Sequence, residues 1–203
     1  QWAQITYQIT YSSGDGTGTM EDDTVYAAAS NNYTLPECNF TAPDGKLFRG
    51  WKVGNNSTIR LPGAKITVSV DTTVTAVWEE AIVEVTVDGA TTQYPSLEQV
   101  IPVVKNKTAE IKVIKDFETT STHSIYANKI VLDLNNHTIT GNRFDFYCET
   151  EVKGSGTIEV TSQIRLQSNF KMIIGENVNI KRTSGTSSTS YAIQAYSGAT
   201  LIL

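Results

Sequence analysis

The fold is decided by residues 129–174, KIVLDLNNHTITGNRFDFYCETEVKGSGTIEVTSQIRLQSNFKMII. In and beside this stretch, short apolar segments return at steps of about 20 residues, a period typical of a solenoid. Three series can be followed: Ile125, Phe146 and Leu166; Leu132, Val152 and Ile173; and Ile139, Ile158 and Ile180. Such a period predicts coils that stack and share one interior.

Local alternation within each period indicates strands rather than helices. Ile130, Leu132 and Leu134 fall on one side of their segment, and Ile158 and Val160 do so in another. Residues that tolerate left-handed backbone separate the segments, at 135–136, 141–142 and 154–156. We therefore predict a right-handed parallel β-helix with three short strands per coil. A further coil is expected from YAIQAY (191–196) to ATLIL (199–203), after a polar insertion at 182–190.

The segment before the coils predicts a hairpin and a helix. Asp88-Gly89 lies between two strand-like runs, which is a strong hairpin signal. Ser96 and Gln99 form a capping box, and Pro102 should keep the helix (96–104) short. This helix is expected to cap the first coil. The chain stops in mid-coil, so we expect an excerpt of a longer protein, with end-to-end association through an uncapped last coil as one prospect.

Residues 1–80 predict a separate small β-sheet domain, followed by the β-helix fragment at 81–203. Three alternating segments should bury one face each. Their inward residues are expected to be Ile5, Tyr7, Ile9 and Tyr11; Ile66, Val68 and Val70; and Val74, Ala76 and Trp78. A tight turn is expected at 71–73. The fold class is therefore all-β with a minor α component.

Composition narrows the function. The chain has 203 residues, a net charge of -5 and 18% charged residues, which give no electrostatic reason to bind nucleic acid. No apolar run approaches the roughly 20 residues of a membrane-spanning helix, so no membrane insertion is expected. Cys38 and Cys148 lie far apart without metal-binding spacing and are interpreted as small buried hydrophobic residues.

The residues from Ile5 to Trp78 resemble the Listeria–Bacteroides repeat family, the small β-grasp-like modules of internalin B and other bacterial surface proteins. The match rests on ITYSSGDGTGTMEDDTV, on YTLPECNFTAPDGKLFRGW with Gly50-Trp51, and on the closing DTTVTAVWEE. The segments VTVDGATTQYPSLEQVI, IVLDLNNHTITG and VKGSGTIEV are similar to the start of pectate-lyase-like β-helix domains. Both resemblances imply display on, or secretion from, a bacterial cell.

No catalytic set emerges from the sequence. Asp133 should face solvent, but the next coil offers Lys153 at its position, so no acidic ladder for Ca²⁺ forms. Asp145 is interpreted as part of a solvated outer face. His137 is interpreted as a corner residue, and His123 has no catalytic motif. No catalytic residue, metal site or cofactor is predicted.

Three functions remain open. The first is a non-catalytic structural or adhesion module at the bacterial cell surface, and the second is a fragment of a polysaccharide-degrading enzyme whose active site lies elsewhere. The third is a glycan-binding module, which would need exposed aromatic rings on a solenoid face. Its candidates are Tyr126, Tyr147, Tyr191 and Tyr196. Expected partners are a glycan or a host or environmental surface protein.

Overall fold

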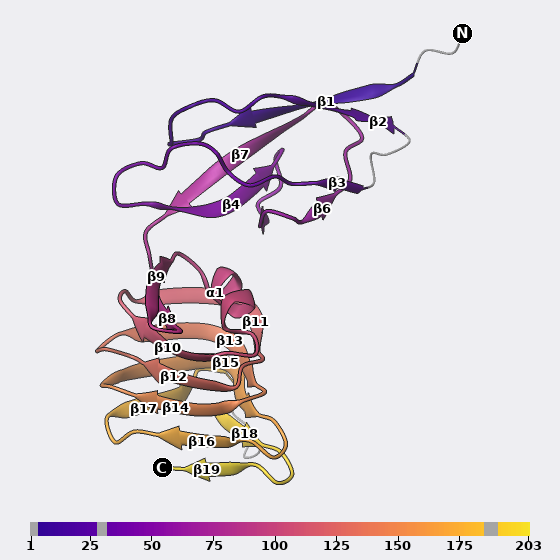
Figure 1. Cartoon of the computed structure of the whole chain (residues 1–203). Helices are drawn as coiled ribbons and strands as arrows, with labels where there is room; N and C mark the ends of the chain where they lie inside the picture. Colours follow the sequence, from indigo (N-terminus) through magenta and orange to yellow (C-terminus); the bar gives the residue numbers. More distant parts are fainter. Residues whose placement is uncertain (1–3, 28–31, 185–190) are drawn as a thin grey trace. The chain divides into compact units, whose positions relative to one another are not determined.

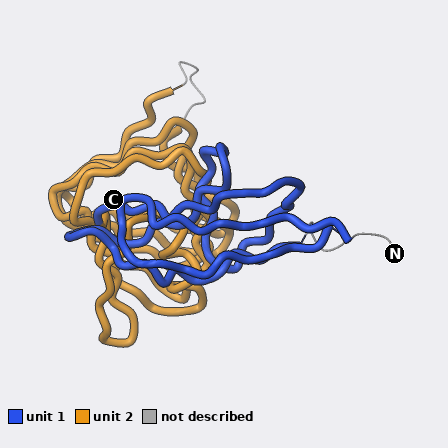
Figure 2. Tube along the Cα trace, turned by 90° about the horizontal axis from the view of Figure 1, so that it is seen from above, with its two compact units in different colours: residues 1–80 blue, residues 81–203 orange. Residues whose placement is uncertain are grey.

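The computed structural model describes residues 4–27, 32–184 and 191–203. About 55% of the chain is strand, with one short helix in the described part. The chain forms two compact units, residues 1–80 and residues 81–203 (Figure 2). The predicted β architecture is confirmed at this level, with sheets in the first unit and a parallel β-solenoid in the second.

The N-terminal unit contains a five-stranded mixed sheet in the order β2-β1-β7-β4-β5 and a two-stranded sheet of β3 and β6. Strands β1 and β7 run parallel, and the other pairs are antiparallel. The strands are β1 (Thr6–Ser12), β2 (Asp23–Tyr26), β3 (Tyr33–Thr34), β4 (Leu47–Val53), β5 (Ile59–Arg60), β6 (Lys65–Ile66) and β7 (Thr72–Glu79).

Two tryptophans hold the core of this unit together. Trp51 is fully buried, and its indole nitrogen donates to the Pro36 carbonyl oxygen at 2.8 Å. Trp78 is also buried and donates to the Ser13 carbonyl oxygen at 2.7 Å. Burying both indole N–H groups with a partner removes the cost of an unmet donor.

The residues expected to point inward are buried in β7, but not in every strand of this unit. Val74, Ala76 and Trp78 are buried as predicted. The strand expected over 65–70 is shorter, because β6 ends at Ile66. Val68 is buried as predicted, but Val70 and Ile5 are 65% and 63% exposed, so their predicted inward positions are wrong. Strand β6 pairs with β3 rather than with β7, so the predicted turn at 71–73 joins no hairpin.

A hairpin and a helix open the second unit. Strands β8 (Val83–Val87) and β9 (Ala90–Tyr94) pair around Asp88 and Gly89, whose φ values of 52° and 80° suit a tight hairpin turn. Helix α1 (Leu97–Val104) follows, and its Val100 and Val104 are buried in the same cluster as the coils. The predicted capping box is wrong in one respect, because the Ser96 side chain makes no cap hydrogen bond.

The solenoid makes about four turns over residues 108–182, and its strands stack in Figure 1. One wall, here the first wall, consists of β10, β12, β14, β16 and β19. The longer strands β11, β13 and β15 pass through a register shift, which divides them into a second wall, continued by β17, and a third wall, continued by β18. Three separate strands were expected in each coil. In the first coils, the second and third of them are instead one continuous strand with a bend.

The bounds of the coil strands are β10 (Thr108–Val113), β11 (Phe117–Ile125), β12 (Lys129–Asp133), β13 (Thr138–Phe146), β14 (Glu149–Lys153), β15 (Gly156–Leu166), β16 (Lys171–Ile174), β17 (Val178–Arg182), β18 (Ile193–Ala195) and β19 (Thr200–Ile202). The expected further coil is thus present as β18 and β19. The polar insertion before it lies largely outside the described residues.

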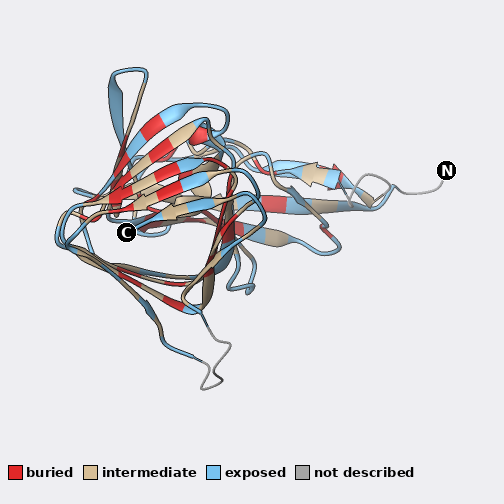
Figure 3. Cartoon of the chain, turned by 90° about the horizontal axis from the view of Figure 1, so that it is seen from below, coloured by how far each residue is buried: buried red, intermediate tan, exposed pale blue. Residues whose placement is uncertain are grey.

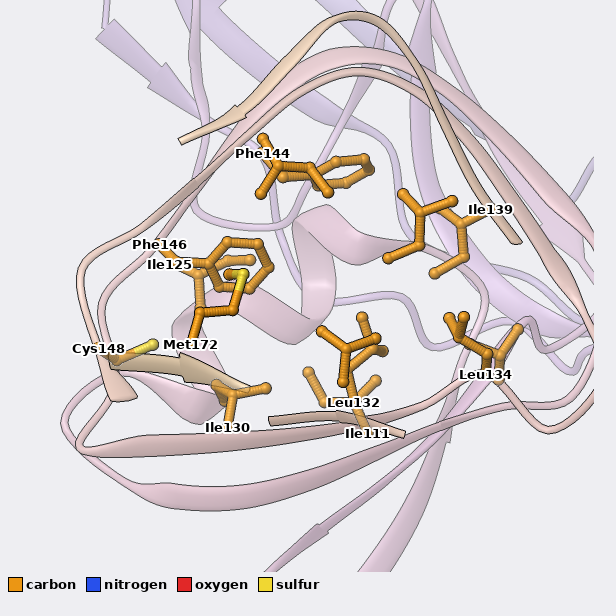
Figure 4. Packing of buried hydrophobic residues seen from close by; sticks show 14 of the residues in the cluster. Ile111, Ile125, Ile130, Leu132, Leu134, Ile139, Phe144, Phe146, Cys148 and Met172 are labelled. Carbon is orange, nitrogen blue, oxygen red and sulfur yellow. The ribbon is translucent and has the colours of Figure 1, made fainter. Parts of the chain in front are cut away.

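The interior is a stack of aliphatic and aromatic side chains (Figure 4). Ile125, Phe146 and Leu166 are register partners, as predicted. Ile139, Ile158 and Ile180 are partners too, but Val152 faces Ile174 instead of the expected Ile173. Buried and exposed residues alternate along the strands (Figure 3), as a common interior requires.

Left-handed backbone forms the corner after the first wall. Asn135 and Asn136 have φ values of 48° and 66°, and the Asn135 amide nitrogen donates to the Val113 carbonyl oxygen one coil away at 3.0 Å. At Gly156, with a φ of 153°, a Cβ atom would lie 2.5 Å from the His137 carbonyl oxygen. These corners fix the stacking that aligns side chains on each outer wall.

Candidate functional site

The outer side of the third wall carries a group of tyrosine, arginine and glutamine side chains around one aspartate. Strand alternation places every second residue of this wall outside, and the register aligns these residues from coil to coil. We call the group the tyrosine–arginine face; it consists of Tyr126, Arg143, Asp145, Tyr147, Gln163, Arg165, Gln194 and Tyr196.

Two of the predicted tyrosines form a stacked pair. Tyr126 follows β11 and Tyr147 follows β13, and their ring centroids lie 4.2 Å apart with an interplanar angle of 18°. Tyr126 remains 45% exposed. A hydrogen bond with the Tyr126 hydroxyl raises the pKa of Tyr147, and desolvation and the charge of Asp145 raise it further. The Tyr147 phenol therefore stays protonated and able to donate at neutral pH.

The other two predicted tyrosines lie further along the chain. Backbone hydrogen bonds from Tyr147 to Ile125, from Gln167 to Phe146 and from Tyr196 to Leu166 repeat on successive coils. Tyr196 therefore shares the column of Tyr126 and Tyr147, with Gln167 in between. Tyr191 stands apart from the column at 64% exposure, and its carbonyl oxygen accepts from the Arg182 guanidinium at 3.4 Å.

Beside the tyrosines lies an ion pair that the sequence did not predict. The Arg143 Nε atom is 3.2 Å from the Asp145 Oδ2 atom, and only 6% of the Asp145 side chain is exposed. Arg165 is the direct register partner of Asp145 on the next coil. The interpretation of Asp145 as part of a solvated outer face is therefore wrong, because neighbours on the same face cover it.

Glutamines complete the face toward the last coil. Gln163 donates to the Oε1 atom of Gln194, and the Tyr196 hydroxyl donates to the same oxygen at 3.4 Å. Amide groups offer donors and an acceptor side by side. The face thus combines flat rings with planar hydrogen-bonding groups.

Several polar atoms of this face are buried without a hydrogen-bond partner. They are Arg143 Nε, Asp145 Oδ1 and Arg165 Nε. Two other side-chain atoms in the described part of the chain share this condition, Ser96 Oγ and Arg182 Nε. Of the three atoms on the face, Arg143 Nε lies 3.2 Å from Asp145 Oδ2 and so remains paired by charge.

The histidines do not form a second site. His137 Nδ1 lies 2.9 Å from Asp116 Oδ1 at a coil corner, and the same oxygen accepts from the Thr138 backbone nitrogen. Both hydrogen bonds lower the pKa of Asp116. His123 is buried inside the stack, where its ring lies on Phe144 and its Nε2 atom is 2.7 Å from Thr119 Oγ1. This inward position agrees with strand alternation, because His123 lies two residues before the inward Ile125.

Metal-binding and redox groups are sparse where the chain is described. Residues 4–27, 32–184 and 191–203 hold no group of three or more His, Cys, Asp or Glu residues able to bind a metal ion. Cys148 is buried, which raises the pKa of its thiol, and Cys38 is half-buried. Neither forms a disulfide.

An apolar cavity of about 40 Å³ lies inside the coil stack. Its lining comes from β8, α1 and the first coils, and includes Val83, Leu97, Phe117 and Phe144. Ligand pockets usually measure about 300–1,000 Å³, so this cavity is a gap in packing and not a substrate site.

Comparison with family models, with curated proteins and with solved structures finds no match for this chain. Among the described residues, no helix combines the length and the hydropathy that crossing a membrane requires.

Proposed function

We propose that this chain is a non-catalytic binding module of an extracellular bacterial surface protein, and that the tyrosine–arginine face of its solenoid binds a saccharide. The observation that carries the proposal is the stacked pair of Tyr126 and Tyr147 beside a buried Asp145 and its arginines. An exposed aromatic ring and polar side chains converge on one surface, which is what a ligand with apolar faces and hydroxyl groups requires.

A saccharide fits this face better than a protein surface does. Protein interfaces bury an apolar centre, and the outer positions of the third wall are polar apart from the tyrosine rings. The apolar side of a pyranose ring packs on an aromatic ring, while its hydroxyl groups both donate and accept hydrogen bonds. Consecutive coils lie about 4.8 Å apart, so the face repeats along the stack and suits a chain of sugar units.

We also propose a specific family for each of the two units. The mixed sheet of residues 1–80 is proposed to be a β-grasp-like member of the Listeria–Bacteroides repeat family, and the solenoid a right-handed, pectate-lyase-like β-helix. Resemblance of the sequence supports both assignments, together with the mixed sheet and the parallel stack. In such proteins the sheet module would space and display the solenoid outside the cell.

Affinity electrophoresis in gels that contain dissolved polysaccharide tests the proposal. The full chain is compared with the Tyr126→Ala/Tyr147→Ala variant in gels of a β-glucan, a mannan, a xylan and polygalacturonate. We expect retardation of the wild type in at least one gel, and about a fivefold loss of affinity in the variant, because aromatic stacking contributes about 1 kcal/mol per pair.

Tyr26→Ala is the matched control. Tyr26 is 50% exposed, similar to Tyr126, but lies in β2 of the N-terminal unit, so its loss should leave retardation unchanged. Equal retardation of all three proteins would contradict the proposed face. Release of unsaturated or reducing products from any of the four polymers would overturn the non-catalytic part of the proposal.

A further inference from the structure

We propose that Tyr126 and Tyr147 form a site of oxidative modification, at which hydrogen peroxide and a haem peroxidase join the two rings by a carbon–carbon bond. The product, a dityrosine, links two consecutive coils on the outside of the solenoid. The ring centroids lie 4.2 Å apart with an interplanar angle of 18°. Non-bonded carbon atoms attract best at about 3.5–4.0 Å, so the two rings are already close to contact.

The backbone gives the two rings the same orientation. Ile125 and Phe146 are register partners on parallel strands, and the Tyr147 backbone nitrogen donates to the Ile125 carbonyl oxygen at 2.9 Å. Tyr126 and Tyr147 each follow one of these partners, so their side chains leave neighbouring coils at equivalent positions. A hydrogen bond also joins the two hydroxyl groups. The phenol ends of the rings therefore lie side by side.

This orientation brings the reactive carbon atoms of the rings together. Removing one electron and one proton from a phenol gives a phenoxyl radical, whose unpaired electron is concentrated on the oxygen and on the ortho and para carbons. The para carbon of tyrosine carries the rest of the side chain, so coupling takes place at the ortho carbon, Cε. Because the two hydroxyl groups are adjacent, the Cε atoms beside them on the two rings are adjacent as well.

The reaction balances with hydrogen peroxide as the oxidant. The peroxide oxidises the haem of the peroxidase by two electrons, and each phenol returns one electron and one proton, so that the peroxide is reduced to water. The two phenoxyl radicals then form one Cε–Cε bond. Each bonded Cε loses its proton and each oxygen regains one, which restores both phenols. The protein loses two hydrogen atoms in total.

Exposure and stacking distinguish this pair from a second pair of tyrosines. Tyr126 is 45% exposed, so an oxidant can reach it from solvent. In the N-terminal unit, the hydroxyl groups of Tyr11 and Tyr33 also share a hydrogen bond, but Tyr11 packs on Trp51 with a centroid distance of 5.6 Å. Within residues 4–27, 32–184 and 191–203, only Tyr126 and Tyr147 stack as two tyrosine rings.

Contact within one molecule favours this product over links between molecules. Groups held together on one chain have effective concentrations of about 1 mM or more, whereas a second molecule in a solution of about 1 μM protein is about a thousandfold more dilute. The bond would also close a loop between residues 126 and 147. A covalent link of this kind restricts the unfolded chain and so makes unfolding of the first coils harder.

Peptide mapping of the oxidised full chain tests the proposal. The protein, at about 1 μM to keep molecules apart, is treated with a haem peroxidase and hydrogen peroxide, and the monomer is isolated, unfolded and digested with trypsin. Cleavage after Lys and Arg places Tyr126 in the peptide 116–129 and Tyr147 in the peptide 144–153, each with a single tyrosine. We expect these two peptides to be joined, with a mass two hydrogen atoms below their sum, as the most abundant dityrosine product.

Conservative variants provide the controls. Tyr126→Phe and Tyr147→Phe keep the rings but cannot form the radical, so each should abolish the joined peptides. Tyr26→Phe changes a tyrosine that is also exposed, at 50%, and should leave their yield unchanged. Dityrosine found only in dimers, or mainly between other tyrosines of the monomer, would overturn the proposal. So would the absence of dityrosine while the same peroxidase couples free tyrosine in a parallel sample. Mapping of the wild type needs no variant and decides by itself.

Discussion

The first and third walls of the solenoid share one backbone repeat, but their outer side chains are organised differently. On the first wall, Lys129 Nζ lies 3.2 Å from Glu149 Oε1, and Lys153 Nζ lies 2.8 Å from Glu110 Oε1. Along one column, Lys112, Asp133 and Lys153 alternate in charge from coil to coil. The charges of this wall are therefore balanced by neighbours.

The third wall leaves its polar groups incomplete. Arg143 and Asp145 approach each other, yet three atoms of the tyrosine–arginine face are buried without a hydrogen bond. Balanced exposed ion pairs contribute little and call for no ligand, whereas an exposed aromatic ring such as that of Tyr126 offers a surface on which a sugar can pack. A binding site is therefore expected on the third wall and not on the first.

The largest effect should come from the interior that both walls share. Phe146→Ala removes a fully packed ring next to Tyr147 and should lower the free energy of unfolding by about 3–5 kcal/mol. Glu118→Ala, an exposed position on β11, should change it by less than about 0.5 kcal/mol. Urea unfolding followed by circular dichroism measures this, and tryptophan fluorescence follows residues 1–80 separately because all three tryptophans lie there. Similar losses in both variants would contradict the common interior.

A tyrosine added to the third wall should strengthen binding. Gln167 interrupts the column of Tyr126, Tyr147 and Tyr196. Gln167→Tyr should make the ring column continuous and tighten saccharide binding about three- to tenfold, since an aromatic pair contributes about 0.5–1.5 kcal/mol. Lys153→Tyr adds the same ring to the first wall and should give no gain when both variants are compared by affinity electrophoresis. An equal gain in both variants would mean that tyrosine binds anywhere on the solenoid.

The ion pairs of the first wall should contribute less. Glu110→Ala and Lys153→Ala should each lower stability by no more than about 1 kcal/mol, with a coupling of similar or smaller size in a double-mutant cycle. Hydrogen bonding to Glu110 raises the pKa of Lys153, so this contribution is present below the unfolded pKa and is lost as the pH rises through the folded pKa. Saccharide affinity should stay unchanged. A marked loss would show that the first wall also takes part in binding.

The smallest effect is expected at the corner of Asp116 and His137. Hydrogen bonds from Thr138 and His137 lower the pKa of Asp116, so its contribution is present above the unfolded value near 3.9 and is lost as the pH falls through the folded pKa. Thermal unfolding between pH 5 and pH 2 should show a shallower loss of Tm in Asp116→Asn than in the wild type. Parallel curves would show that this corner adds nothing at acid pH.

Much of the solenoid could be predicted because inward residues repeat with the coil. The series through Phe146 and Ile158 matches the pairing of β13 and β15. The step from Leu132 to Val152 is 20 residues, but the step from Val152 to Ile174 is 22. The corner after β15 has four residues, 167–170, and the corner after β13 has only two, 147–148, which accounts for the two added residues. Corner length depends on local turn geometry, such as the φ of 66° at Asn169, which apolar spacing does not reveal.

The candidate site was only partly predictable for a related reason. Tyr126 and Tyr147 follow register partners, so their proximity could be inferred from the period. Alternation places Asp145 outside, but its burial depends on Arg165, which lies a whole coil away in the sequence. The pairing between successive coils contains the information that these two residues are neighbours. Applied to outward residues as well as inward ones, the same 20-residue step would have brought Asp145 and Arg165 together.

The apolar cavity inside the first coils gives the molecule a mechanical property. A void of about 40 Å³ disappears when the chain unfolds, so the unfolded state has the smaller molar volume and hydrostatic pressure shifts the equilibrium toward it. Compression should therefore loosen the solenoid first beneath α1, where the lining residues meet. Enlarging Val83 by one methylene, as in Val83→Ile, would fill part of the void and make the protein more resistant to pressure.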